Sequence, residues 1–443
     1  MQYFGTDGIR QPADKFTPEF LTRIIAGLVD YAGNNIKVLI AGDTRESTEW
    51  ILADLETALE TFSVEFGNAG ILPTPAISYC FYQMGFDFAI DVTASHNPYT
   101  DNGIKIFERG PTSSVKLSES GRKAIETSLN SDKTYALVSP TLREDLHQEA
   151  VELYKNHLLE YLGTADFSDL HIGLDCANGA TSIINKSIFT QLGAKVELIH
   201  ISTNYNTKIN HDCGSTHLES LQELVATQHL DFGAAFDGDG DRCLLIDETG
   251  EIIDGDQILV ILANYFNLDS IVTTVMANQG LLDWAKQNHI HAEITSVGDS
   301  NVTATMHQQN IKIGSEQSGH VILPGEPTGD GMLTALMVAK AVSEHKKSLN
   351  TLASAMTKFP QIIVNMSATN EQKSNLKTSD SAKATLLAYD QKLASINGRL
   401  LVRPSGTEPL IRITMWGKDK DIINKLANEL KNELGEILWK SPH

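Results

Sequence analysis

A recurring order of apolar runs and polar loops constrains the fold of this chain more than any other feature of its sequence. Three short apolar runs, rich in β-branched residues, each end in a polar or glycine-containing turn that a helical pattern follows: Lys37–Ile40, His171–Leu174 and Ile271–Met276. This pattern is typical of a buried parallel strand that enters a βα unit. It predicts an α/β fold built from three similar copies.

Each copy continues with a second and a third apolar run. The second runs are Ser63–Phe66, Lys195–Ile199 and Ala292–Ser296, and the third runs are Asp87–Val92, Asp231–Phe236 and Ile311–Ile313. A polar loop follows each third run and begins at Thr93, Asp237 or Gly314. Functional loops in open α/β sheets lie at the carboxyl ends of strands, so we expect the three loops to line one central cleft.

The length of 443 residues requires several domains, because ordinary domains contain about 100–150 residues. We predict three similar α/β mixed-sheet domains over residues 1–150, 151–252 and 253–360. Residues 361–443 differ, with strand-like runs at Leu400–Val402 and Leu410–Met415 and a closing helical pattern over Asp419–Leu438. We expect them to form a smaller α+β domain.

Charge and hydropathy exclude several classes of partner. The formal net charge of −21 argues against a general nucleic-acid binder, whose surface would be basic. Met1–Arg10 lacks the apolar segment of a signal peptide, and the longest apolar run, Ile258–Ala263, is too short to span a bilayer. We therefore expect a cytoplasmic protein without a membrane or nucleic-acid partner, either a monomer or a homodimer. Its four cysteines lack CxxC spacing and are expected to be free thiols.

The first polar loop, Thr93-Ala-Ser-His-Asn-Pro98, precedes Asp101-Asn-Gly-Ile-Lys105. Pro98 disfavours helix at the preceding residue, so Ser95 is expected on a turn. A serine exposed beyond a strand end can act as a nucleophile or carry a phosphate. The same sequence is also a good structural turn or helix cap, and the residues alone leave both interpretations open.

The second loop, Asp237-Gly-Asp-Gly-Asp-Arg242, holds three carboxylates that repel one another unless a cation neutralises them. Oxygen ligands of this kind suit a hard cation such as Mg²⁺. A calcium EF-hand loop is the alternative, but Arg242 stands where that loop needs glycine. The flanking runs also indicate strands, whereas an EF-hand requires helices.

The third loop, Gly314-Ser-Glu-Gln-Ser-Gly-His320, carries Glu316 and Ser318, which would share one face of an extended loop. A carboxylate and a hydroxyl on one face suit a pair of sugar hydroxyls, but this loop alone favours an ordinary polar turn over a sugar-binding site.

The fourth loop, Arg403-Pro-Ser-Gly-Thr-Glu-Pro409, has Arg412 close behind it. Main-chain N–H groups near Gly406, the hydroxyls of Ser405 and Thr407, and two guanidinium groups favour a phosphate site. A capped surface turn with a salt bridge is the alternative.

Taken together and in this order, the four loops resemble those of the α-D-phosphohexomutase superfamily from Tyr3 to Gly417. The resemblance implies that Ser95 is the phosphoserine and, with its phosphate, a ligand of one Mg²⁺ per site. It implies these roles for the other residues: metal ligands Asp237, Asp239 and Asp241; substrate-binding residues Arg242, Glu316, Ser318, Arg403, Ser405, Gly406, Thr407 and Arg412; and candidate proton carriers Arg10, His96, Lys105 and His320.

Finer features resemble the members of this superfamily that act on hexosamine phosphates. They are Phe4-Gly-Thr-Asp-Gly-Ile-Arg10, Cys213-Gly-Ser-Thr-His217, Gln317 and Gly406. The resemblance implies interconversion of glucosamine 6-phosphate and glucosamine 1-phosphate through a sugar 1,6-bisphosphate, in the supply of UDP-N-acetylglucosamine and cell-envelope precursors. The alternatives are a glucose- or mannose-phosphate mutase, a catalytically weak sugar-phosphate-binding protein and a Mg²⁺-dependent phosphatase.

Three positions depart from the superfamily pattern, namely Gln11, Ser300 and Ser315. Ser300 stands where a basic residue is usual, and a missing positive charge there would affect phosphate binding. His211, Cys213 and His217 have the residue types of metal ligands, but we assign them to the family segment and expect no zinc.

Overall fold

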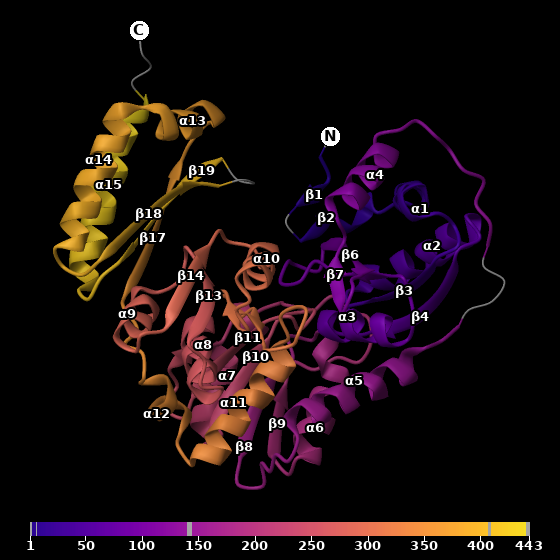
Figure 1. The fold of residues 1–443 in the computed structure, drawn as a ribbon, viewed down its shortest axis with the longest axis horizontal. Coiled ribbons are helices and arrows are strands. Elements are labelled where there is room, and N and C mark those ends of the chain that lie inside the picture. The colour runs from indigo at the N-terminus through magenta and orange to yellow at the C-terminus, as the bar shows by residue number, and fades with distance from the viewer. Residues whose placement is uncertain (1, 6, 140–143, 406–408, 440–443) are drawn as a thin grey trace. The chain divides into compact units, whose positions relative to one another are not determined.

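The computed structural model describes residues 2–5, 7–139, 144–405 and 409–439 and divides the chain into two compact units. The first comprises Met1–Thr274 and Thr295–Ser354, and the second comprises Val275–Ile294 and Ala355–His443. The described elements form mixed and antiparallel sheets with helices packed on them (Figure 1), so the predicted α/β class is confirmed.

The first sheet has the order β1-β2-β6-β5-β3-β4, and β7 pairs with β6. Its strands are β1 (Phe4–Gly5), β2 (Gly8–Pro12), β3 (Lys37–Gly42), β4 (Glu65–Ile71), β5 (Phe88–Val92), β6 (Asp101–Arg109) and β7 (Ser114–Lys116). Strands β4 and β5 run parallel to β3, as the sequence predicts, whereas β6 runs antiparallel to β5. The sheet brings Asp91 of β5 opposite Lys105 of β6.

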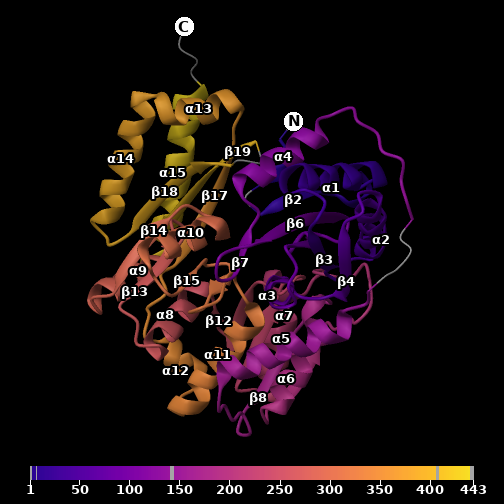
Figure 2. The same cartoon turned by 45° about the vertical axis from the view of Figure 1, so that its right-hand side comes forward.

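Four helices accompany this sheet: α1 (Pro18–Ala32), α2 (Glu46–Thr61), α3 (Thr74–Gln83) and α4 (Glu119–Leu129). Helix α1 begins where Thr17 accepts a hydrogen bond from the Phe20 N–H and Pro18 occupies the first turn. The α1 residues Leu21, Ile25 and Leu28 are spaced along one helical face and are fully buried in the first core. Helices α1 and α4 lie side by side (Figures 1 and 2).

The second sheet has the order β12-β11-β10-β8-β9. Its strands are β8 (His171–Asp175), β9 (Lys195–Ile199), β10 (Phe232–Phe236), β11 (Cys243–Asp247) and β12 (Ile252–Ile253), with helices α5 (His147–Leu162), α6 (Asn185–Gln191) and α7 (Glu219–Gln228). Strands β9 and β10 run parallel to β8, and β11 returns antiparallel to β10. This copy therefore repeats the first, with a parallel core and an antiparallel return after the polar loop.

The third copy within the first unit contains β13 (Ser270–Thr274), β15 (Gly314–Ser315) and β16 (Val321–Ile322), with helices α8 (Gly255–Tyr265), α10 (Asp299–Gln309), α11 (Gly331–His345) and α12 (Leu349–Ala353). Its third strand begins later than predicted: Ile311, which belongs to a buried apolar cluster, and the buried Ile313 both precede the paired residues. The Val272 N–H still donates to the Ile313 carbonyl, so the strand lies beside β13 as expected.

In the second unit, an antiparallel sheet of order β17-β19-β18 consists of β17 (Gln361–Ser367), β18 (Arg399–Pro404) and β19 (Leu410–Trp416). Helices α13 (Asn370–Thr378), α14 (Asp380–Ala394) and α15 (Lys420–Trp439) accompany it, with α14 and α15 side by side (Figure 2). Val275–Ile294 contributes α9 (Gln279–Gln287) and most of β14 (His291–Thr295) to this unit.

The four cysteines are free and buried, as predicted. Among the residues that the structure describes, no helix combines the length and apolar character needed to cross a bilayer.

Candidate functional site

Ser95 follows β5 and has a left-handed backbone, with φ of 54°. This conformation is uncommon for a residue with a side chain, so neighbouring groups must hold it. The Ser95 N–H donates to Thr93 Oγ1 at 2.9 Å, and the Ser95 side chain is fully buried. Its hydroxyl donates to Asp237 Oδ2 at 2.7 Å, so the first polar loop meets the second.

The loop between β10 and β11 gathers the three aspartates. One carboxylate oxygen from each of Asp237, Asp239 and Asp241 lies within 4.8 Å of the other two, and all three residues are buried. Gly240 has φ of 71°, and a Cβ at Gly238 would lie 2.8 Å from the Ser95 carbonyl oxygen. The two glycines therefore let the loop turn tightly and approach Ser95 closely.

Lys105 supplies a positive charge beside these carboxylates. Its Nζ lies 2.8 Å from Asp239 Oδ2, 3.0 Å from Asp241 Oδ2 and 3.2 Å from Asp7 Oδ2. One ammonium does not balance the cluster, because burial and the charges of Asp239 and Asp241 raise the pKa of Asp237 well above its usual range. Oδ1 of Asp239 and Oδ1 of Asp241 are buried without a hydrogen-bond partner. Oxygen ligands with uncompensated charge fit a hard divalent cation.

His96 lies beside the Ser95 hydroxyl, and the charges of two arginines act on His96. His96 Nδ1 lies 3.2 Å from Ser95 Oγ. Burial, with the charges of Arg242 and Arg10, lowers the pKa of His96 to about 4, so its imidazole is neutral at pH 7. Arg242 Nε lies 3.9 Å from Asp237 Oδ2, and Arg10 pairs with Asp7 at 2.8 Å.

The third loop forms a turn, which is one of the two interpretations of its sequence, and not the extended loop that would put Glu316 and Ser318 on one face. The Gly319 N–H donates to the Glu316 carbonyl, and the Glu316 N–H donates to the His320 carbonyl. Glu316 is therefore buried with Oε1 accepting from the Gly298 N–H at 2.9 Å, whereas Ser318 is exposed. His320 is 2% exposed, and neither of its ring nitrogens has a hydrogen-bond partner.

The fourth loop belongs to the second unit. Arg403 and Arg412 stand opposite each other on β18 and β19, so two guanidinium-bearing residues flank the loop. The Ser405 N–H donates to the Leu410 carbonyl, and its carbonyl accepts from Lys373 Nζ at 2.8 Å. The predicted residues Gly406 and Thr407 lie outside the described residues.

Sequence patterns missed Lys116, which pairs with Asp7 Oδ1 at 2.5 Å and also with Asp299. Lys116 lines the same pocket as Ser300, Lys105 and Arg122. The pocket therefore contains positive charge although Ser300 itself carries none. Lys116 lies on a three-residue strand that has no motif around it, so only its position in the fold reveals it.

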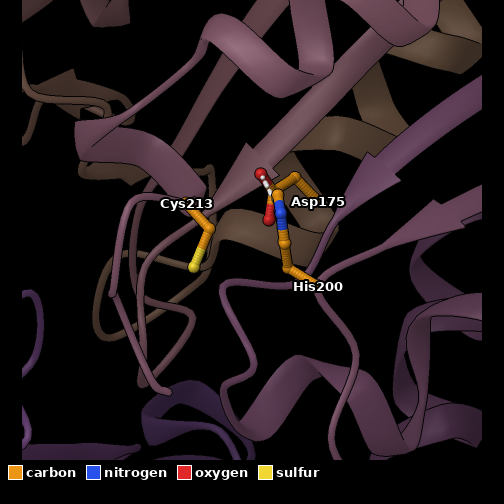
Figure 3. Close-up of side chains that lie close together, drawn as sticks. All are labelled: Asp175, His200 and Cys213. Carbon is orange, nitrogen blue, oxygen red and sulfur yellow. Dashed lines mark hydrogen bonds and ion pairs between the residues drawn. The ribbon is translucent and has the colours of Figure 1, made fainter.

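Asp175, His200 and Cys213 form another group with ligand-type side chains (Figure 3). Asp175 Oδ2 accepts hydrogen bonds from His200 Nδ1 and from the Gly214 N–H, both at 3.0 Å, and Oδ1 accepts from the Ala177 N–H at 2.9 Å. Burial and the Asp175 charge raise the pKa of Cys213 to about 12, so the thiol is protonated. These hydrogen bonds make the group an anchor for the loop that contains Cys213. The exposed His211 pairs instead with Asp212.

The four domains match known family models in chain order. Residues 1–136, 152–250 and 254–359 match the α/β/α domains I, II and III of phosphoglucomutase/phosphomannomutase, and residues 364–433 match the C-terminal domain.

Two solved structures have similar folds. One is a phosphoglucomutase/phosphomannomutase family protein from Burkholderia thailandensis, with a TM-score of 0.76, 20% identity and 99% and 98% of the two chains covered. The other is an N-acetylphosphoglucosamine mutase from Aspergillus fumigatus in complex with GlcNAc-6P and magnesium, with a TM-score of 0.66, 15% identity and 98% and 96% covered. The fold is that of the phosphohexomutases.

Curated relatives narrow the family further. A phosphoglucosamine mutase from Clostridioides difficile is 37% identical, with 99% of each chain covered. Another from Caldicellulosiruptor bescii is 39% identical, with 96% of this chain and 97% of the relative covered. The chain therefore belongs to the phosphoglucosamine mutase family within the α-D-phosphohexomutase superfamily.

Proposed function

We propose that this chain interconverts glucosamine 6-phosphate and glucosamine 1-phosphate, with Ser95 as the phosphoryl carrier. The observation that carries the proposal is the meeting of the Ser95 hydroxyl with the buried aspartate cluster, at 2.7 Å from Asp237 Oδ2. Family membership over nearly the whole chain supports the same reaction class, an isomerisation by phosphoryl transfer.

Asp237, Asp239 and Asp241 would hold Mg²⁺ together with a phosphate oxygen on Ser95. When bound, the ion would neutralise charge on the phosphoryl group that is transferred. The residues favour this assignment because phosphoserine carries roughly −1.5 to −2 charge at neutral pH and would otherwise face three carboxylates. We expect that a chelator abolishes turnover and that added Mg²⁺ restores it.

In the forward reaction, a sugar hydroxyl attacks the phosphorus of phospho-Ser95, the bond between phosphorus and Ser95 Oγ breaks, and a sugar 1,6-bisphosphate forms. After the sugar reverses its orientation, Ser95 Oγ attacks the other phosphate and releases the 1-phosphate. Each attacking hydroxyl needs a proton acceptor. Of the four candidate proton carriers, Arg10 and Lys105 carry positive charge, and although burial opposes the rise, the neighbouring aspartates raise the pKa of Lys105 further, so they would stabilise the phosphoryl group and not accept a proton. That leaves His96 and His320 as the acceptors, and His96 is a neutral base with Nδ1 3.2 Å from Ser95 Oγ.

Recognition of the sugar and its distal phosphate is assigned to residues that the family pattern singles out. Glu316, Ser318 and Arg242 would contact sugar hydroxyls or the reacting phosphate, and Arg403, Ser405, Gly406, Thr407 and Arg412 would hold the phosphate that is not reacting. We further propose that the reaction takes place in the cytoplasm and supplies amino sugar for cell-envelope precursors.

The proposal is tested by incubating the phosphorylated protein and Mg²⁺ with the 6-phosphates of glucosamine, glucose and mannose separately. We expect 1-phosphate to form fastest from glucosamine 6-phosphate. Faster turnover of glucose or mannose phosphate would overturn the assigned sugar, and release of inorganic phosphate would indicate a phosphatase.

The role of Ser95 is tested by Ser95→Ala, which should abolish turnover. Ser47→Ala is a matched control, because it also removes a buried hydroxyl, one that accepts from Asn102 Nδ2 at 2.8 Å. Substantial activity in Ser95→Ala would remove the central claim.

A further inference from the structure

Arg45 is fully buried, and each of its guanidinium nitrogens donates a hydrogen bond. Nε donates to Asp43 Oδ2 at 2.9 Å. The two terminal nitrogens donate to four main-chain carbonyls of one loop: Ser95 at 2.7 Å, Asn97 at 2.9 Å, Pro98 at 2.5 Å and Asp101 at 3.1 Å. Guanidinium has five N–H donors in a rigid fork, and all five have partners here. Arg45 therefore fixes the path of the loop that carries Ser95.

Asp43 connects this guanidinium to the backbone of the same loop. Its Oδ2 also accepts from Thr93 Oγ1 at 2.6 Å, and Thr93 Oγ1 in turn accepts from the Ser95 N–H at 2.9 Å. Its Oδ1 accepts from the Arg45 N–H and from Thr48 Oγ1. The N–H and the carbonyl of Ser95 are thus both held by one connected network.

Asn210 reaches the same carbonyls from the second copy of the fold. It lies on the loop between β9 and the short helix η3 (Gly214–Thr216), and its N–H donates to the Ala177 carbonyl at 3.0 Å. Asn210 Nδ2 donates to the Ser95 carbonyl at 2.8 Å and to the Asn97 carbonyl at 3.2 Å. The Ser95 carbonyl therefore accepts hydrogen bonds from two side chains, Arg45 in the first copy of the fold and Asn210 in the second.

These contacts explain how Ser95 keeps its left-handed backbone. Such a conformation persists only where the surroundings determine it strongly, and it is commonly found at active sites. The plane of the peptide that follows Ser95 is fixed by Arg45 and Asn210, so the Cα–Cβ bond keeps its direction and Oγ points to Asp237.

We propose that Arg45 and Asn210 are positioning residues for phosphoryl transfer at Ser95, and that they act by holding the main-chain carbonyl oxygens of the Ser95 loop. This inference rests on the proposed function, because it assigns a purpose to the geometry of the phosphoryl carrier. Neither residue needs to touch the sugar or the phosphate. Their loss is expected to lower kcat while leaving KM nearly unchanged, since substrate contacts remain in place.

The test compares Asn210→Ala and Asn210→Asp with Asn206→Ala as the matched control. Asn206 lies on the same loop, and its side chain also donates to main-chain carbonyls, those of Thr44, Asn178 and Asn204, but to none in the Ser95 loop. We expect kcat to fall roughly 10- to 100-fold for both Asn210 variants, because small displacements of a reacting group have effects of this size. Asn206→Ala should retain kcat, and all three proteins should keep similar unfolding midpoints.

Arg45→Lys provides the second variant, because a single ammonium cannot span four carbonyls and a carboxylate. Its kcat should fall further than that of Asn210→Ala, and a phosphate placed on Ser95 by a sugar 1,6-bisphosphate should be transferred to glucosamine 6-phosphate more slowly in a single turnover. If Arg45→Lys does not fold, the kcat values of the Asn210 variants alone test the positioning role.

Equal kcat values for wild type and Asn210→Asp, or an equal fall in Asn206→Ala, would overturn the positioning role. A wild-type protein that neither acquires phosphate on Ser95 nor forms glucosamine 1-phosphate would overturn the proposed function, and the inference with it. The two failures are distinguishable, because only the second affects the wild type.

Discussion

The first and second copies of the fold place an aspartate at the end of their first strand and pair it with different cations. Asp43 follows β3 and accepts from the N–H two residues on, that of Arg45, at 3.0 Å. Asp175 ends β8 and accepts from the N–H two residues on, that of Ala177, at 2.9 Å. The partner of Asp43 is Arg45 Nε, whereas the partner of Asp175 is His200 Nδ1. The same loop design thus uses a permanent charge in one copy and a titratable one in the other.

The choice of guanidinium in one copy and imidazole in the other matches the loop that each aspartate positions. In the first copy, the guanidinium is fully buried and fixes the loop of the proposed phosphoryl carrier. In the second copy, His200 is partly exposed, and Asp175 anchors, through the Gly214 N–H, the end of the loop that carries Asn210, so it acts on the Ser95 loop only indirectly. A guanidinium stays charged at every working pH, so the carrier loop keeps its geometry where an imidazole would lose its charge.

Asp43→Asn should have the largest effect, because it leaves the Arg45 guanidinium buried without its carboxylate. Loss of one partner of a buried ion pair typically destabilises by about 3–5 kcal/mol. The urea midpoint of the transition that involves the first sheet should fall accordingly, and turnover should be lost with it. Asp14→Asn is the control, since that carboxylate is exposed and should change nothing. An unchanged midpoint in Asp43→Asn would show that the pair contributes no stability.

Asp175→Asn should have a smaller effect on the second copy. The amide oxygen can still accept from the Ala177 N–H, while the hydrogen bond with His200 or Gly214 is weakened. An unsatisfied or weakened buried hydrogen bond typically costs about 1–3 kcal/mol. Hydrogen exchange of β8 and of the Gly214 amide measures this loss locally. A loss as large as that of Asp43→Asn would contradict the distinction between the two copies.

The sequence was sufficient to predict the loops at the strand ends, because alternation of apolar runs and polar loops is a local pattern. The sequence pattern singled out Ser95 and the three aspartates, and the resemblance to the superfamily gave Ser95 its role, whereas only the structure brings the hydroxyl of one loop to a carboxylate of the other. The antiparallel neighbour β6 and the late start of β15 were not predicted, since strand pairing depends on partners distant in the chain.

Arg45 and Asn210 could not be recognised from the sequence. Each acts on main-chain carbonyls at least 50 residues away, so no spacing within the chain marks them. The choice between a turn and an extended third loop stayed open for a related reason. The hydrogen bonds that form the turn, between Glu316 and His320 and between Gly319 and Glu316, use main-chain groups, which the pattern of side chains does not reveal.

His200→Gln should change the pH dependence of stability in the second copy only. The hydrogen bond to Asp175 raises the pKa of His200, while burial opposes the rise. The stabilisation is therefore fully present below the unfolded pKa of about 6.5 and is lost as pH rises through the higher folded pKa. Because His200 is partly exposed, the effect should be below about 1 kcal/mol. Between about pH 5.5 and 8.5, the urea midpoint of wild type should fall as pH rises, and this dependence should be lost in His200→Gln. If the pH dependence persists unchanged in the variant, a group other than His200 causes it.

Cys213→Ser should have the smallest effect and shows whether the second copy differs from the first in binding a metal. Both oxygens of Asp175 already accept hydrogen bonds, and the raised pKa of Cys213 keeps the thiol protonated, so a metal would have to displace protons and existing bonds. We therefore expect Zn²⁺ to leave the unfolding midpoints of wild type and Cys213→Ser equally unchanged. The serine variant itself should lose less than about 1 kcal/mol, because the hydroxyl can keep the partners of the thiol, Asn178 Nδ2 at 3.7 Å and the Lys208 carbonyl at 3.9 Å, and so avoids the cost of an unpaired buried hydroxyl. If Zn²⁺ raises the unfolding midpoint of wild type but not that of Cys213→Ser, then Asp175, His200 and Cys213 form a metal site. Asp175 would in that case bind a metal in addition to anchoring its loop.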